Sequence, residues 1–157
     1  MSDTSGMTED QRIFNEIAQV LGRIAPASAN EMIFRGKIYD DYSSGLPAWV
    51  DTDGNETVFG ADGTLPLRDI GEILDLAEEL LETPIFKANP FNQFEIRINR
   101  ELDLKVTLAD IPKSQTWNNL FMRPVSDLTE MEAEQFDIPT EDWAACVAAA
   151  DELSKGA

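Results

Sequence analysis

Carboxylates are the side chains that could do chemistry in this chain, since it has 30 acidic residues, one cysteine and no histidine. Without an imidazole, no Ser-His-Asp or Cys-His arrangement can form. The single thiol of Cys146 cannot build a zinc site. The acids then have two chemical uses. Paired carboxylates can act as general acid and base, and clustered carboxylate oxygens can hold a hard cation.

The segment from Asp51 to Asp62 has the length and early spacing of an EF-hand calcium loop, with oxygen side chains at its first, third, fifth and twelfth positions. Glu56, however, stands where the sharp turn requires glycine, and Asp62 is shorter than the usual bidentate glutamate. Neither flank has a helical pattern. We therefore interpret the segment as a polar turn and expect no metal and no cofactor.

Adjacent acids occur at Asp40 and Asp41 and again at Glu141 and Asp142, where two carboxylates could share acid and base roles. Consecutive residues of a strand point to opposite faces, so Asp40 and Asp41 cannot form one site through a strand. We therefore expect that the chain is not an enzyme. A carboxylate-dependent hydrolase is the alternative, and it predicts that turnover disappears when one acid is changed to its amide.

The formal net charge is −18, and the acids are unevenly placed. Twelve acidic residues and one basic residue lie between Asp40 and Glu82, and nine acidic residues and no basic one lie between Asp127 and Glu152. A surface with this much negative charge repels nucleic acid and anionic membranes and favours a basic protein partner. We expect the acids of the loops, which no helix requires, and the neighbouring tryptophan to contact that partner: Asp40, Asp41, Trp49, Asp51, Asp53, Glu56 and Asp62.

The elements that must position these acids follow from hydrophobic spacing. A capping box at Thr8 and Gln11 opens a helix that runs to about residue 24, and short strands follow at about 32–42, 48–50 and 57–59, with a turn at 43–45. A helix over 70–81, two strands between 94 and 108, and a helical tail complete the chain, the tail including a capping box at Thr129 and Glu132. This order predicts an α+β fold with an antiparallel sheet of about five strands. We expect residues 1–7 to be disordered and residues 8–157 to form a single domain.

The two strands between Phe94 and Leu108 alternate apolar and polar residues, which predicts a hairpin with one buried face. We place its turn over residues 99–101, because this register keeps the apolar residues on one face and opposite charges together on the other. Five cross-strand pairs follow: Ile98 with Leu102, Ile96 with Leu104, Phe94 with Val106, Arg97 with Asp103, and Glu95 with Lys105.

The order of elements, the sequence FNEIA at 14–18 and the sequence KIYDD at 37–41 resemble the YezG-like family of bacterial immunity proteins. The resemblance covers about residues 9–111. Members of that family are small cytoplasmic proteins that bind and neutralise a cognate toxin domain, commonly a nuclease. The resemblance implies that this chain protects its producer from such a toxin.

A type III secretion chaperone is the competing interpretation, because those acidic homodimers, which bind an unfolded effector segment, resemble this chain in size, acidity and helix–strand order. A single cysteine and a polar N-terminus without a signal peptide predict a cytoplasmic protein. Its apolar runs stay short of the roughly 18 residues of a membrane span. The sequence leaves the oligomeric state open, with a monomer slightly favoured.

Overall fold

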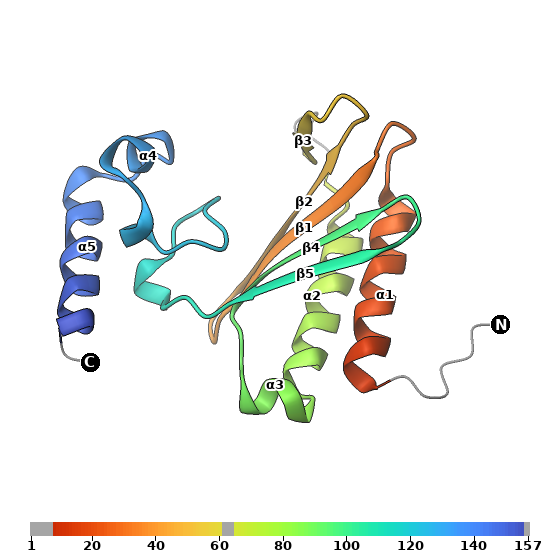
Figure 1. Cartoon of the computed structure of the whole chain (residues 1–157), viewed down its shortest axis with the longest axis horizontal. Coiled ribbons are helices and arrows are strands. Elements are labelled where there is room, and N and C mark those ends of the chain that lie inside the picture. Colours follow the sequence, from red (N-terminus) through yellow and green to blue (C-terminus); the bar gives the residue numbers. More distant parts are fainter. Residues whose placement is uncertain (1–7, 61–64, 156–157) are drawn as a thin grey trace.

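The chain forms one five-stranded antiparallel sheet with helices on one face, which confirms the predicted α+β class (Figure 1). The structure is a computed structural model that describes residues 8–60 and 65–155. The disorder predicted for residues 1–7 concerns a segment outside the described residues. The predicted order of elements is confirmed, with one short helix added before the fourth strand.

The helices and strands begin close to the predicted positions, except that β2 begins at Ser43 and not near residue 48. Both predicted capping boxes are present, at Thr8 with Gln11 and at Thr129 with Glu132. Pro84 begins a short helix instead of only ending the one before it. The elements are α1 (Glu9–Ile24), β1 (Glu31–Ile38), β2 (Ser43–Val50), β3 (Glu56–Val58), α2 (Leu67–Leu81), α3 (Pro84–Ala88), β4 (Gln93–Asn99), β5 (Leu104–Ala109), α4 (Glu130–Gln135) and α5 (Thr140–Lys155).

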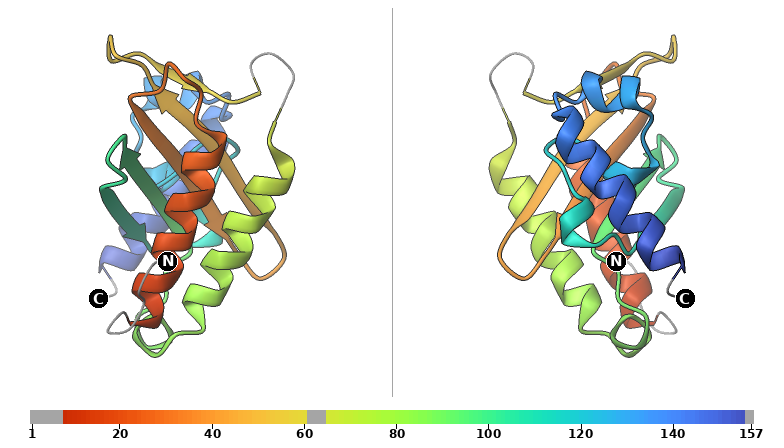
Figure 2. Two further views of the ribbon diagram at one scale, coloured as in Figure 1. Left: turned by 90° about the vertical axis from the view of Figure 1, so that its right-hand side faces the viewer. Right: turned by 90° about the vertical axis from the view of Figure 1, so that its left-hand side faces the viewer.

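The strands lie in the order β3-β2-β1-β4-β5, and α1 and α2 cover one face of the sheet. Alternate residues of β1 and β4 point to that face, so Phe34 and Ile96 are fully buried beneath Ile17 and Ile73 of the two helices. Figure 2 shows α4 and α5 on the opposite side of the sheet from α1 and α2. That second face of β1, β2 and β4 is called the open face below.

Residues 112–155 form a small helical unit, the C-terminal unit, with a hydrophobic cluster of its own. Leu120, Val125, Leu128, Ala133 and Ile138 are buried together in it. Trp143 of α5 packs against this cluster and donates its indole N–H to the main-chain oxygen of Leu128 at 2.8 Å. Among the described residues, no helix is long and apolar enough to cross a membrane.

The hairpin of β4 and β5 has a different register from the predicted one. Ile98 lies opposite Leu104, two residues further on than predicted, and Arg97 lies opposite Lys105. The turn is longer than expected because the side-chain oxygen of Asn99 accepts the main-chain N–H groups of residues 101 and 103. A shift of two residues leaves every side chain on its predicted face, so the alternation could not reveal it. The five predicted pairs, including Arg97 with Asp103 and Glu95 with Lys105, are therefore wrong.

The turn between β1 and β2 also lies earlier than predicted. Residues 43–45 belong to β2, and the chain turns between Tyr39 and Tyr42, whose main-chain N–H and oxygen are joined at 2.9 Å. Gly36 and Gly45 lie opposite each other on these strands. The rings of Phe94 and Phe34 stack with centroids 5.8 Å apart, each over one of the two glycines. The missing side chains make room for this aromatic pair.

Candidate functional site

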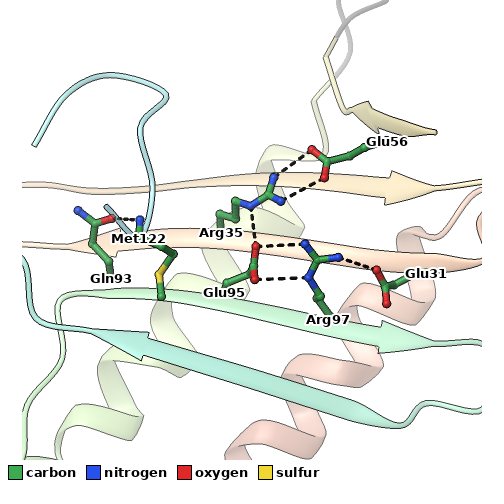
Figure 3. Close-up of polar contacts among 7 residues, drawn as sticks. All are labelled: Glu31, Arg35, Glu56, Gln93, Glu95, Arg97 and Met122. Atoms are coloured by element: carbon green, nitrogen blue, oxygen red, sulfur yellow. Dashed lines mark hydrogen bonds and ion pairs between the residues drawn. The ribbon is translucent and has the colours of Figure 1, made fainter. Parts of the chain in front are cut away.

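A line of five charged side chains crosses the open face of the sheet (Figure 3). Alternation along β1 and β4 directs Arg35, Glu95 and Arg97 away from the helices. Arg35 holds both oxygens of Glu56 on β3, at 3.0 and 3.1 Å, and its Nε donates to Glu95 at 2.8 Å. Arg97 continues the line from Glu95 to Glu31, which it contacts at 2.8 Å.

These contacts favour the charged forms of Glu56 and Glu95. The hydrogen bonds from Arg35 hold the pKa of the Glu56 carboxyl below its usual value. Burial opposes ionisation of Glu95, yet the combined bonds from Arg35 and Arg97 outweigh it and lower its pKa as well. Three carboxylates and two guanidiniums remain, so this line of ion pairs carries one net negative charge.

Side chains at the end of the same face hold the main chain of the C-terminal unit. Tyr39 donates its hydroxyl to the main-chain oxygen of Ile111, the residue just before that unit, at 2.8 Å. Gln93, which is fully buried, accepts the main-chain N–H of Met122 at 2.6 Å (Figure 3). It also donates to the Tyr39 hydroxyl at 3.1 Å. The sheet therefore positions this segment through its backbone.

Lys37 is the third of these side chains. Its ammonium donates to the main-chain oxygen of Trp117 at 2.6 Å and lies 4.7 Å from the centre of the Phe121 ring. Only 4% of Lys37 is exposed. Burial disfavours its charge and lowers its pKa to about 8. A cation buried here is tolerated because a carbonyl and a ring face both meet it.

A cleft runs between β2 and residues 116–123 of the C-terminal unit, which are called the docked segment below. It consists of two cavities of about 590 and 530 Å³ that share Leu46, Asn119 and Phe121 in their walls. Lys37 and Tyr42 line the first cavity, and Arg35 and Glu56 line the second. The volumes are in the range of ligand-binding pockets.

Three cations along this cleft are each paired with two carboxylates, and the fourth, Lys37, is held by a main-chain oxygen and a ring instead. Lys113 contacts Asp41 at 2.6 Å and Asp40 at 3.5 Å. It lies three residues before Thr116, which lines the first cavity. Arg123, in the wall, contacts Asp127 and Glu132 at 3.0 Å each. Arg35 with its two glutamates is the third such cluster. The cleft is thus bordered by more negative than positive charge.

Of these acids, Glu132 has the most strongly lowered pKa. Its hydrogen bonds to Arg123, followed by the main-chain N–H of Thr129, lower its pKa to about 2. The Lys113 ammonium similarly holds the pKa of Asp41 below its usual value. Glu132 and Asp41 are therefore ionised at neutral pH.

The structure places three of the predicted contact acids beside this cleft. Asp40 and Asp41 lie in the β1–β2 turn next to Tyr42, and Glu56 lies in the wall. Asp40 and Asp41 lie before the first residue of β2, whereas Glu56 pairs with Val50 at its other end. Whether they contact a partner stays a prediction.

The other predicted residues lie elsewhere. The carboxylate of Asp51 accepts main-chain N–H groups of Asp53 and Asn55, at 2.9 and 3.0 Å, and so closes the β2–β3 turn at the far end of β2. Trp49 points to the face covered by helices, where its ring packs edge-to-face with the Phe59 ring and the two ring centroids are 4.7 Å apart. Asp62 lies outside the described residues.

Lys37, Gln93 and Arg123 are site residues that sequence analysis missed. The alternation in β1 and β4 places Lys37 and Gln93 opposite the apolar face, which was a usable signal of their direction. Their partners lie 80 and 29 residues further along the chain, and no local pattern identifies them. Arg123 follows a stretch that has no clear helix or strand pattern.

The cleft can bind a ligand. No group of three or more potential metal ligands is gathered anywhere in residues 8–60 and 65–155. The cleft instead offers acidic rims and an apolar floor, which suit a cationic and partly apolar ligand. Models of known protein families and the curated proteins show no match to this chain, so its resemblance to YezG-like immunity proteins stays a prediction.

Proposed function

We propose that this chain is a cytoplasmic immunity protein that binds and neutralises a basic, nuclease-type toxin domain through an acidic surface. One observation carries the proposal: the acids outnumber the cations even where the cations cluster. Arg12 contacts three carboxylates, and five further Arg and Lys side chains contact two each: Arg23, Arg35, Arg97, Lys113 and Arg123. The charges of these six side chains are paired within the molecule, and the net charge of −18 is left for a partner.

The C-terminal unit supports the same proposal. The exposed side chains of α4, α5 and the turn between them include seven acids, and the sequence has no Lys or Arg between Glu130 and Leu153. Those exposed acids are Glu130, Glu134, Asp137, Glu141, Asp142, Asp151 and Glu152. The acidic surface therefore extends from the cleft over the helices beside it.

A nuclease must present basic groups to phosphates, so an acidic protein can occupy the surface that its substrate needs. Charge of opposite sign also steers two proteins together, and raises association to about 10⁸–10⁹ M⁻¹s⁻¹ at low salt. Fast capture suits a protein that must intercept a toxin before the toxin reaches nucleic acid. This advantage falls as salt screens the charges.

Co-purification with the product of the neighbouring gene, followed by a toxicity-rescue assay, tests the proposal. We expect a stable complex and survival of cells that make both proteins. Failure to bind or to rescue contradicts the proposed function. Association rates measured over a range of ionic strength test the electrostatic part separately, and a rate that does not change with salt removes the steering argument.

The alternative, a secretion chaperone, predicts a homodimer. One feature favours it: β5 is an edge strand of the sheet, and Leu102, Leu104 and Leu108 beside or within it are at least one-third exposed. A second copy could pair along this edge. Light scattering on the purified protein distinguishes the two functions, because a strict monomer rules strongly against the chaperone.

A further inference from the structure

The cleft between β2 and the docked segment has walls that are fixed in place. On one side, the main chain at Trp117 and Met122 is held by Lys37 and Gln93 of the sheet. The oxygen of Trp117 also accepts the N–H of Leu120 at 3.1 Å, which closes a tight turn that projects Asn119 and Phe121 into the cleft. A pre-formed groove of this kind binds a ligand without losing conformational entropy to order its own walls.

The opposite wall is a strand with an available edge. β3 pairs only with Ala48–Val50, so among the described residues no strand lies beside the first part of β2, from Ser43 to Leu46. Ser44, Gly45 and Leu46 all line the first cavity. An extended chain lying here can hydrogen-bond to a strand edge along its backbone.

The chemistry of the cleft selects the side chains of such a segment. Leu46 and Phe121 form an apolar floor that both cavities share. Glu56 at one end and Asp40 with Asp41 at the other belong to clusters that each carry one net negative charge. An occupant with apolar side chains toward the floor and arginine or lysine toward the two ends is complementary to this pattern.

We propose that an extended basic segment of the toxin domain lies in this cleft alongside Ser43–Leu46, and that the cleft is the centre of the inhibitory interface. The proposal rests on the proposed function and identifies where that function is exerted. Asp40, Asp41 and Glu56 are then contact residues, whereas Asp53 at the far turn and Leu104 on β5 lie outside the interface.

Paired variants test the location. Leu46→Trp fills the cleft, and Leu104→Trp makes the same change at an exposed leucine on the far edge of the sheet. The probe is the neighbouring gene's toxin domain, inactivated by substitution, with binding measured by titration calorimetry and folding of each variant by circular dichroism. We expect Leu46→Trp to weaken binding by roughly tenfold or more, and Leu104→Trp by less than about twofold.

A second pair of substitutions, which change the structure less, tests the location if the Leu46→Trp variant does not fold. Asp41→Asn removes one rim charge, and Asp53→Asn removes an exposed charge at the β2–β3 turn. We expect weaker binding and a shallower salt dependence for Asp41→Asn only. Hydrogen exchange on the wild-type complex should show new protection at 43–46 and at 117–121.

The outcomes separate the two claims. No binding and no rescue by the wild-type chain contradicts the proposed function, and the cleft proposal fails with it. Wild-type binding that Leu46→Trp and Asp41→Asn leave unchanged overturns the cleft proposal and leaves the immunity function standing. Binding that is lost in Leu104→Trp alone places the interface on the β5 edge instead, which also overturns it.

Discussion

Lys37 on β1 and Trp117 of the C-terminal unit are joined by a 2.6 Å hydrogen bond that spans 80 residues of sequence. The donor is a buried ammonium and the acceptor is a main-chain oxygen. This bond and the one from the Met122 N–H to Gln93 together fix the C-terminal unit against the sheet. Because the acceptor belongs to the backbone, the bond from Lys37 does not involve the Trp117 side chain, which donates separately to the main-chain oxygen of Phe136 at 3.1 Å.

Removing this side chain should loosen the cleft. Lys37→Ala leaves the oxygen of Trp117 without its partner and opens a space under Phe121, so we expect a loss of about 2 kcal/mol in the free energy of unfolding. Lys37→Met keeps an apolar stem of similar length and removes a buried charge, and should cost less. Urea denaturation of both variants measures the difference, and Lys37→Ala as stable as the wild type would contradict it.

The stability contributed by Lys37 should also depend on pH. Its pKa is lowered by burial from the usual 10.5 to about 8, so between these values the unfolded chain binds more protons than the folded one. The stability of the wild type relative to Lys37→Met should therefore rise from pH 8 to 10.5, by about 1.4 kcal/mol per pH unit, and stay constant below pH 8. Urea denaturation at several pH values checks this, and a constant difference across the window contradicts it.

The two glycines beneath the aromatic pair provide a test of packing. A Cβ at Gly45 would overlap the Phe34 ring, so Gly45→Ala should destabilise the fold by about 1–3 kcal/mol. Gly71→Ala in α2 is the matched control, because a Cβ there meets nothing within 4 Å. It should stabilise the helix by roughly 0.5–1 kcal/mol. Thermal unfolding distinguishes them, and equal effects of the two substitutions would exclude the packing explanation.

Features that depend on near neighbours were predictable from the sequence. Both capping boxes were predicted correctly, since each joins residues three positions apart. The hairpin register was not, because a two-residue shift preserves the faces and Arg97 finds Glu31 on another strand. The cleft was not predictable either, because it forms only when Lys37 and Gln93 hold a segment that has no pattern of its own. Three acids that border it were nevertheless among the predicted contact residues.

The capping box of α4 connects local helix stability to the edge of the cleft. The hydroxyl of Thr129 accepts the N–H of Glu132, and the carboxylate of Glu132 accepts both the N–H of Thr129 and the guanidinium of Arg123. Thr129→Ala removes one bond of this box and should destabilise α4 by about 1 kcal/mol. Thr129→Ser keeps the hydroxyl and serves as the control. Hydrogen exchange of the α4 amides measures the effect, and similar exchange in both variants would show that the cap does not stabilise α4.

The capping box of Thr129 and Glu132 should continue to stabilise α4 in mild acid. Because the folded pKa of Glu132 is about 2 and the usual value is 4.5, its stabilising contribution is complete above pH 4.5 and is lost only as pH falls toward 2. Glu132→Gln lacks this titration and retains an oxygen that can accept the N–H of Thr129. The α4 amides of the wild type should therefore lose protection relative to this variant between pH 4.5 and 2. Carboxyl chemical shifts followed by NMR locate the titration directly, and a midpoint near 4.5 would mean that Arg123 and Thr129 do not hold the carboxylate in solution.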